Sequence, residues 1–131
     1  MAVKPAHLSP RQAKGREYEQ LACTYLRRQG YQLLEANVRF PVGELDLIAL
    51  DGPALCLIEV RARAPGRFGA AADSITAEKR RRLIRAAKWY LQRRRRTWTG
   101  PVRFDVVAID LDPHGQPSVR LIRNAFYADG W

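Results

Sequence analysis

The spacing of hydrophobic residues changes along the chain and predicts two helices and five strands. Residues 9–30 carry apolar side chains at helical spacing. Ser9 is a typical N-cap residue, Pro10 fits the first helical position, and Gly30 fits the position after the last turn. The apolar stripe consists of Tyr18, Leu21, Ala22, Tyr25 and Leu26. We therefore expect a helix here with one face against the core.

Three strands are predicted after this helix. The segment 31–40, YQLLEANVRF, reads as the first of them. The segments 43–50, GELDLIAL, and 54–63, ALCLIEVRAR, lie on either side of the turn signal DGPA. We expect these two segments to form an antiparallel hairpin.

The second half of the chain contains one more helical pattern and two more strand patterns. Residues 64–74 are rich in small side chains and are predicted to form a loop. Residues 76–96 have Thr76 as a helix cap and Glu78 in the first turn. The core face of this helix is predicted to contain Leu83, Ile84, Ala87, Tyr90 and Leu91. The apolar run PVRFDVVAIDL and the segment PSVRLIRNAF are predicted to be the last two strands.

The order of these elements predicts the fold class. A long helix between the third and fourth strands allows those two strands to lie parallel, through a right-handed crossover. The fold is therefore expected to be α/β, a mixed β-sheet flanked by helices in the order α-β-β-β-α-β-β. With 131 residues, the chain suits one domain, 1–131, with a core at about 9–123 and a short irregular C-terminal tail.

The amino-acid composition indicates the expected cellular compartment and the expected kind of binding partner. Cys23 and Cys56 are the only cysteines and lack metal-ligand spacing, which indicates reduced thiols in a cytoplasmic protein. No apolar run approaches the length of a membrane span, so no membrane location is expected. The formal net charge is +10, which favours a polyanion, either nucleic acid or an anionic membrane surface. A basic protein without such a partner is the plainer alternative.

Basic residues are concentrated in the second predicted helix, where residues 79–96 contain no acid. Such a run is usually a solvated face, but so many like charges repel one another along one helix. A nearby phosphate backbone relieves this repulsion, so we expect nucleic-acid contact. The candidate contact residues are Arg63, Lys79, Arg80, Arg81, Arg82, Arg85, Lys88, Arg93, Arg94, Arg95 and Arg96.

The strand segment LIEVRAR carries the candidate chemistry. Its charged residues Glu59, Arg61 and Arg63 are two apart and share one face of the strand. An even-length hairpin turn places Asp46 opposite Glu59, and Glu44 opposite Arg61. Repulsion between the two opposed acids is relieved by a shared proton, by a bridge to the arginines, or by a divalent cation.

Spacing alone leaves an acid–base ladder and a metal site equally open. The apolar neighbours of the two acids favour the metal, because an unpaired charge among them is costly. Carboxylate oxygens are hard ligands suited to Mg²⁺ or Mn²⁺, and no His/Cys cluster indicates zinc.

Five segments together resemble one known family. They are GREYEQLACTYLRRQGYQLLEANVR, GELDLIA, LIEVRAR, FGAAADSITAEKRRRLIRAAKWYL and RFDVVAID. In order and spacing they are similar to the YraN-like family of small bacterial proteins. That family is placed in the PD-(D/E)xK nuclease superfamily, close to archaeal Holliday-junction resolvases. The resemblance covers roughly residues 11–110 and implies a restriction-endonuclease-like core.

The resemblance also implies roles for individual residues. Asp46 and Glu59 match the two acidic metal ligands, and the main-chain carbonyl of Val60 would complete the protein's share of the metal site. Glu19 matches a glutamate placed on the first helix beside the site. Arg61 stands where the superfamily usually has a lysine. The implied catalytic set is therefore Glu19, Asp46, Glu59 and Arg61.

The expected function is hydrolysis of phosphodiester bonds in DNA by a Mg²⁺- or Mn²⁺-dependent endonuclease, with branched and single-stranded DNA as candidate substrates. Resolvase relatives act as dimers, so a homodimer is expected. One alternative is a nucleic-acid-binding module that keeps the fold without catalysis. Another is a basic adaptor that docks on an acidic protein or on RNA.

Overall fold

The computed structural model describes residues 9–64, 69–94 and 98–126. Five strands form one sheet in the order β1-β2-β3-β4-β5, and only the β3–β4 pair is parallel. The predicted α/β class, the mixed sheet and the element order are confirmed. The elements are α1 (Pro10–Arg28), β1 (Gln32–Phe40), β2 (Gly43–Asp51), β3 (Ala54–Arg63), α2 (Ala70–Asp73), α3 (Ala77–Arg94), β4 (Val102–Leu111) and β5 (Pro117–Phe126).

The boundaries of α1 follow from the residues predicted to set them. The Ser9 hydroxyl accepts a hydrogen bond from the backbone N–H of Gln12 at 3.2 Å, and the Gln12 side chain accepts one from the Ser9 N–H at 2.9 Å. This reciprocal capping box satisfies two donors that a helix start leaves unpaired. Gly30 follows the last turn with φ 92°, a left-handed backbone conformation that glycine adopts without steric cost.

One predicted segment differs from the structure. The segment 64–74, expected to be a loop, contains the one-turn helix α2 after Gly69, because the three alanines of this turn pack against the sheet through the fully buried Ala71. β5 ends at Phe126, as the predicted strand PSVRLIRNAF does, and the Phe126 ring stacks on that of Phe104 with centroids 4.7 Å apart. Residues 127–131 of the expected C-terminal tail lie outside the described residues.

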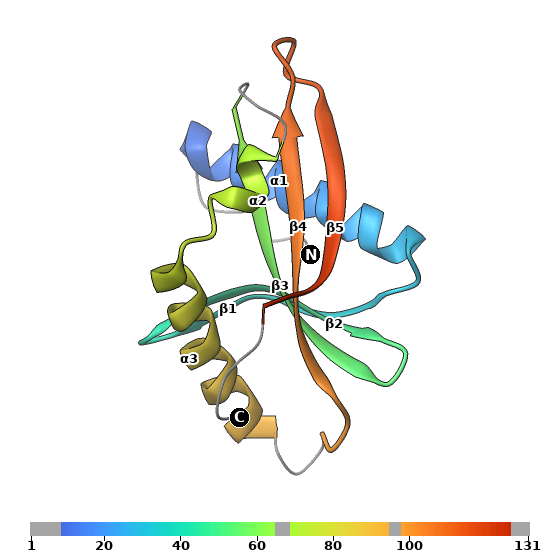
Figure 1. The fold of residues 1–131 in the computed structure, drawn as a ribbon, viewed down its shortest axis with the longest axis vertical. Helices are drawn as coiled ribbons and strands as arrows, with labels where there is room; N and C mark the ends of the chain where they lie inside the picture. The colour runs from blue at the N-terminus through green and yellow to red at the C-terminus, as the bar shows by residue number, and fades with distance from the viewer. Residues whose placement is uncertain (1–8, 65–68, 95–97, 127–131) are drawn as a thin grey trace, which may run out of the picture.

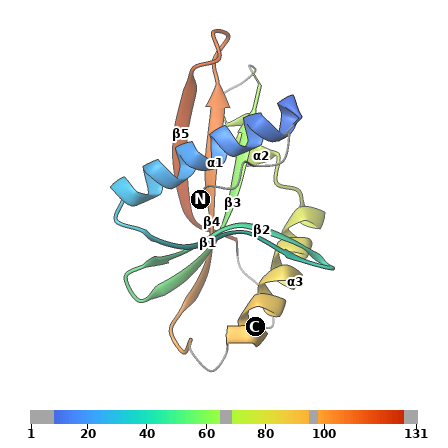
Figure 2. The same cartoon turned by 180° about the vertical axis from the view of Figure 1, so that it is seen from behind.

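The helices cover opposite faces of the sheet. In Figure 1, α2 and α3 lie in front of the strands, and in Figure 2, turned by 180°, α1 crosses in front of them. α1 packs on a cluster around Leu47, Ile58 and Val107, whereas α3 packs on one around Ile48 and Leu57. Within the described ranges the helices are α1, α2 and α3. None of these three is long and apolar enough to cross a membrane.

β3 and β4 form the centre of the sheet and are buried on both faces. Residues 54–59 of β3 and 104–109 of β4 are all buried. The parallel pairing predicted from the intervening helix explains this burial, since α1 and the α2–α3 layer each cover one face. Each buried run contains one acid, Glu59 in β3 and Asp105 in β4. These two acids therefore require partners of some kind.

The antiparallel ladder between β2 and β3 stops before the strands end. It runs from Asp51–Ala54 to Leu47–Ile58, while β2 remains paired with β1 as far as Gly43. Both views show the β1–β2 ribbon bending away from β3 (Figures 1 and 2). The two strands thus fork, and Asp46 and Glu59 are the first residues beyond the last pair.

Candidate functional site at the strand fork

Asp46 and Glu59 lie on the two branches of the fork. One Asp46 carboxylate oxygen, Oδ2, accepts a hydrogen bond from the backbone N–H of Val60 at 2.9 Å. The Glu59 side chain is 5% exposed, and its Oε2 atom is buried without a hydrogen-bond partner. The predicted ladder ends one residue short of this pair. The structure nevertheless brings the two acids together, since Asp46 bonds the backbone N–H of Val60, the residue that follows Glu59.

The pKa of Glu59 is raised to about 9, mainly by burial and in addition by the neighbouring Asp46 carboxylate. The positive charges of Lys79 and Arg61 act in the opposite direction and do not outweigh burial. Without a divalent cation, Glu59 therefore keeps a proton at neutral pH. Protonation is one of the three ways in which the sequence predicts that this repulsion is relieved.

Lys79 of α3 faces the same carboxylate. Its Nζ atom lies 3.6 Å from Glu59 Oε2, and the lysine side chain is 31% exposed. The sequence places Lys79 among the nucleic-acid contacts, with no link to the acidic pair. The first turn of α3 instead brings its ammonium group to the fork. A lysine near a helix start was the available signal, because cations are disfavoured there.

Arg61 is directed elsewhere. Its Nε atom donates to the Ser74 hydroxyl at 2.9 Å, and its Nη2 atom donates to the Ser74 carbonyl at 3.4 Å. The predicted Glu44–Arg61 pair is wrong, because the β2–β3 ladder ends before reaching it. Glu44 lies instead beside Arg39, its register partner on β1, with 3.6 Å between Oε2 and Nε.

Glu19 reaches the fork from α1, as the resemblance implies. It lines a cavity of about 160 Å³ together with Asp46 and Val60. Burial raises its pKa, the Asn37 hydrogen bond lowers it, and the Asp46 and Glu44 charges raise it. Glu19 also borders a larger open groove of about 540 Å³ along α1, whose other lining residues are Arg16, Gln20, Cys23, Thr24, Arg27 and Asn37.

Asn37 holds Glu19 in place. Its amide Nδ2 donates to Glu19 Oε1 at 2.7 Å. The ladder pairs Ala36 with Leu47 and Val38 with Leu45, so Asn37 lies across from Asp46. Its φ of 54° is left-handed, a conformation that asparagine tolerates better than most residues. The sequence analysis missed Asn37, and an asparagine inside a strand pattern was the only signal for it.

The residues at the fork fit a divalent cation. A buried carboxylate oxygen without a hydrogen-bond partner, Glu59 Oε2, is an available hard ligand beside a second carboxylate. In the described ranges no three His, Cys, Asp or Glu side chains form a metal cage. Two carboxylates are enough for Mg²⁺, because this ion is commonly held by one or two carboxylates and completes its coordination shell with water and substrate oxygens.

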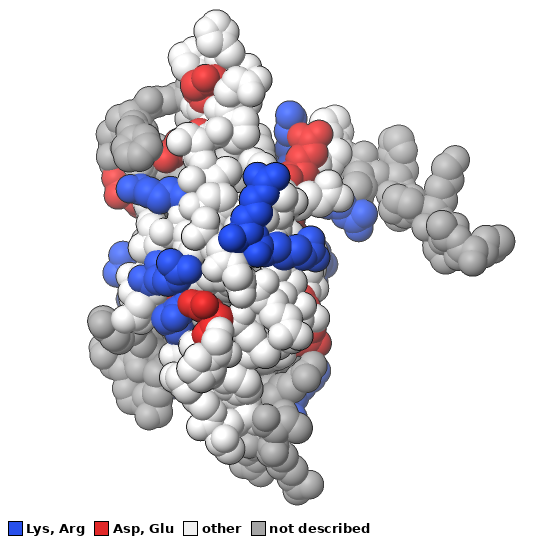
Figure 3. Space-filling view, turned by 90° about the vertical axis from the view of Figure 1, so that its right-hand side faces the viewer, with Lys and Arg blue, Asp and Glu red and all other residues white. Residues whose placement is uncertain are grey.

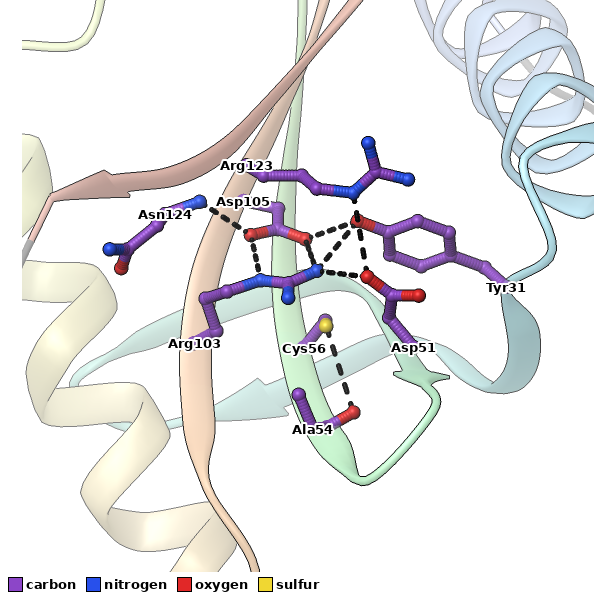
Figure 4. A network of polar contacts seen from close by, with 8 residues as sticks. All are labelled: Tyr31, Asp51, Ala54, Cys56, Arg103, Asp105, Arg123 and Asn124. Atoms are coloured by element: carbon purple, nitrogen blue, oxygen red, sulfur yellow. Dashed lines mark hydrogen bonds and ion pairs between the residues drawn. The ribbon is translucent and has the colours of Figure 1, made fainter.

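The second buried acid, Asp105, has a full set of partners (Figure 4). Its Oδ1 atom accepts hydrogen bonds from Arg103 Nε and from the Asn124 backbone N–H, both at 2.9 Å. Its Oδ2 atom accepts from the Tyr31 hydroxyl at 2.7 Å and from Arg103 Nη2 at 3.0 Å. Arg103 also bonds Asp51 at 2.7 Å. Asp105 is therefore a structural residue that ties the α1–β1 connection to β4 and β5.

The basic residues of α3 divide into engaged and free ones. Arg82 pairs with Glu78 at 2.9 Å, and Arg80 and Arg93 lie over the rings of Phe126 and Phe40. Arg63, on β3, is exposed and donates to the carbonyl of Ala62. The side chain of Arg94, and Arg95 and Arg96 entirely, lie outside the described residues.

Three α3 bases are exposed and have no partner among the described residues: Arg81, Arg85 and Lys88. Their spacing of four and three residues places them on one stripe of the helix, which we call the basic stripe. Basic side chains are not confined to this helix, because Lys and Arg also gather across the middle of the side drawn in Figure 3. The basic stripe is therefore a part of the predicted contact set that is available to a polyanion.

The chain is similar to one family over most of its length. The model of the Uncharacterised protein family UPF0102 matches residues 18–109. The UPF0102 protein of Pseudomonas aeruginosa (strain LESB58) is 47% identical over 116 residues, which cover 88% of this chain and 93% of that protein. Those of Symbiobacterium thermophilum and Janthinobacterium sp. (strain Marseille) are 45% and 50% identical, covering 87% and 81% of this chain and 96% and 87% of the relatives.

The fold is therefore α/β with a forked mixed sheet, and the chain belongs to the UPF0102 family. The resemblance to the YraN-like family is confirmed. The description of this family states no activity.

Proposed function

We propose that this chain is a metal-dependent endonuclease that hydrolyses phosphodiester bonds in nucleic acid, with DNA favoured. The observation that carries the proposal is the buried Glu59 Oε2, which has no hydrogen-bond partner, beside Asp46 in the strand fork. A chain does not retain such a group for stability, because an unsatisfied buried acceptor costs about 1–3 kcal/mol. A divalent cation bound at the fork would coordinate this oxygen and so remove the cost.

Each residue at the fork has a part in this proposal. Asp46 and Glu59 would hold Mg²⁺ or Mn²⁺ through carboxylate oxygens, with the Val60 carbonyl as a further ligand. The bound ion supplies an activated water and polarises the phosphoryl oxygens. The Val60 N–H orients the Asp46 carboxylate, and Asn37 orients Glu19 toward the same cavity. Preorganised partners of this kind are what a catalytic site needs.

Two features support a nucleic-acid substrate. The groove along α1 shares Glu19 with the cavity at Asp46, so a strand lying in it would reach the fork. Arg16 and Arg27 line this groove, and guanidinium groups bind phosphate well. On the other face of the sheet, the basic stripe adds charge that makes binding depend on salt.

The test is incubation of branched, single-stranded and duplex DNA with the wild type in Mg²⁺, Mn²⁺ or EDTA. We expect cleavage only with the metals, and a rise in melting temperature when Mn²⁺ is added without DNA. Asp46→Asn should lower cleavage more than about 100-fold and abolish the rise, because one hard ligand is lost.

Asp112→Asn is the matched control. Asp112 is an exposed turn residue whose Oδ1 accepts two backbone hydrogen bonds, and an asparagine oxygen can accept them too. This variant should cleave like the wild type. Salt-dependent binding of all substrates with no cleavage in either metal would reject the nuclease and favour the non-catalytic binding module.

A further inference from the structure

We infer that Lys79, rather than Arg61, supplies the positive charge that contacts the substrate phosphate at the fork, and that Arg61 is a positioning residue. This inference rests on the proposed function and concerns which side chain completes the site. It reverses the roles that the strand motif implies, because Arg61 stands where a lysine is usual. The geometry of the two side chains carries the argument.

Arg61 is committed to the α2 segment. Its two hydrogen bonds reach the hydroxyl and the carbonyl of Ser74, the residue that follows α2. The Ser74 hydroxyl in turn donates to the Ala71 carbonyl at 2.6 Å. Arg61 and Ser74 together therefore hold the end of α2. A guanidinium suits this position, since the C-terminal end of a helix carries partial negative charge. Turning Arg61 toward a phosphate would break these bonds.

Lys79 is free to serve the site. Its ammonium group lies 3.6 Å from Glu59 Oε2, which is close enough for an ion pair and too long for a good hydrogen bond. The ammonium therefore keeps its three donors for other oxygens. Its side chain is 31% exposed, so it borders both the buried acid and the surface from which a substrate would approach.

The position of Lys79 in α3 is unfavourable for the helix itself. The Thr76 hydroxyl accepts a hydrogen bond from the Lys79 backbone N–H at 3.1 Å, which places Lys79 in the first turn. The partial positive charge of a helix N-terminus repels cations, and acids such as Glu78 are preferred there. Glu59 is the acid that the fold places beside this lysine, and it belongs to the candidate site.

The expected action of Lys79 is electrostatic. A compact ammonium next to the acidic pair can contact a non-bridging phosphate oxygen and offset the negative charge that grows there during hydrolysis. It contacts substrate and would be a catalytic residue. Arg61 would act only through the α2 segment and the strand that carries Glu59.

The test compares Lys79→Ala, Lys79→Arg and Arg61→Ala with the wild type, and uses Lys14→Ala as control. Lys14 is an exposed lysine of α1 that pairs with Glu17 at 3.2 Å and does not line the cavity at Asp46. We measure cleavage in Mn²⁺, Mn²⁺ binding by calorimetry without DNA, and the melting temperature in EDTA.

Lys79→Ala should cleave about 100-fold more slowly and bind Mn²⁺ about fivefold more tightly, because a cation that repels the metal is gone. A merely structural lysine would not give these opposite signs. Lys79→Arg should recover part of the cleavage. Arg61→Ala should melt at a lower temperature and lose less activity than Lys79→Ala, and Lys14→Ala should match the wild type in all three measurements.

Cleavage by Lys79→Ala at the wild-type rate would overturn the inference while leaving the nuclease intact. So would loss of cleavage in Arg61→Ala with an unchanged melting temperature. If the wild type itself cleaves no substrate, the proposed function fails instead. In that case an unchanged Mn²⁺ affinity in Lys79→Ala also rejects Lys79 as part of the site, whereas tighter binding supports it.

Discussion

Asp105 and Glu59 are both buried acids on neighbouring central strands, with exposed fractions of 1% and 4%. They differ in how many hydrogen-bond partners their carboxylate oxygens have. Asp105 accepts four hydrogen bonds, two of them from Arg103. Glu59 has one oxygen with no hydrogen bond and a lysine at ion-pair distance. Burial alone therefore does not identify a functional acid. The informative quantity is how many partners the buried oxygens have.

Each of the two regions contains an asparagine in the left-handed backbone conformation, and the two asparagines have different hydrogen-bond partners. Asn37 and Asn124 both have φ 54° and lie across from an acid on the neighbouring strand, Asp46 and Asp105 respectively. Asn124 gives its backbone N–H directly to the acid. Asn37 instead directs its side chain to Glu19. One asparagine closes a structural network, and the other extends the candidate site.

The largest expected effect comes from the same substitution made in both regions. Asp105→Asn should lower the free energy of unfolding by about 3–5 kcal/mol, because Arg103 and Tyr31 lose a buried acceptor and its charge. Asp46→Asn should change it by less than about 1 kcal/mol, since the remaining carbonyl oxygen can still accept from Val60. Urea unfolding at pH 7 in EDTA measures both. Equal losses would mean that the two acids do not differ in role.

The structural half of this comparison was largely predictable from the sequence. Alternation, caps and turn residues depend on neighbours along the chain, so both long helices, all five strands and the hairpin register at Leu50–Leu55 are as expected. The pairing of Arg103 with Asp105 is two residues apart on one strand face and is equally local. The loop prediction for α2 failed because a single turn of alanines has no periodicity of its own.

The candidate site was predictable only in part. The strand spacing and the resemblance both indicate Asp46 and Glu59, and the resemblance alone indicates Glu19. In the structure Asp46 lies near enough to Glu19 and to Glu59 to raise the pKa of each. The end of the β2–β3 ladder, the turn of Arg61 toward Ser74 and the approach of Lys79 depend on how layers pack across the sheet. Such contacts between distant segments leave no spacing pattern in the sequence. They are therefore visible only in the structure.

A second, smaller effect concerns pH. The pKa of Glu59 is raised from 4.5 to about 9, so between these values the unfolded chain loses a proton that the folded chain keeps. Stability therefore falls as pH rises through this window. Glu59→Gln removes this dependence and should stabilise the metal-free protein by about 1–3 kcal/mol at pH 8.5, with a smaller gain at pH 5.

Thermal unfolding in EDTA at several pH values tests this, with Glu44→Gln as control. Glu44 is more exposed, and its ion pair with Arg39 at 3.6 Å contributes little, so that variant should stay within about 0.5 kcal/mol. Asp51 gives the opposite slope, because its hydrogen bond from Arg103 lowers its pKa and the stability it adds is lost as pH falls. A Glu59→Gln variant that is less stable than wild type at pH 8.5 would contradict the comparison.

The smallest effect on stability distinguishes the two asparagines. Glycine adopts φ 54° freely, so Asn37→Gly and Asn124→Gly should each change the free energy of unfolding by less than about 1 kcal/mol. Asn124→Gly keeps the backbone N–H that Asp105 needs.

Asn37→Gly removes the donor that lowers the pKa of Glu19, so this pKa should rise in that variant and stay unchanged in Asn124→Gly. Carboxyl titration by NMR reports the pKa, and cleavage in Mn²⁺ should fall about tenfold only in Asn37→Gly, because Glu19 is then no longer held toward Asp46. If Asn124→Gly instead destabilises the fold as much as Asp105→Asn, the side chain of Asn124 matters more than its backbone, and the two asparagines are alike after all.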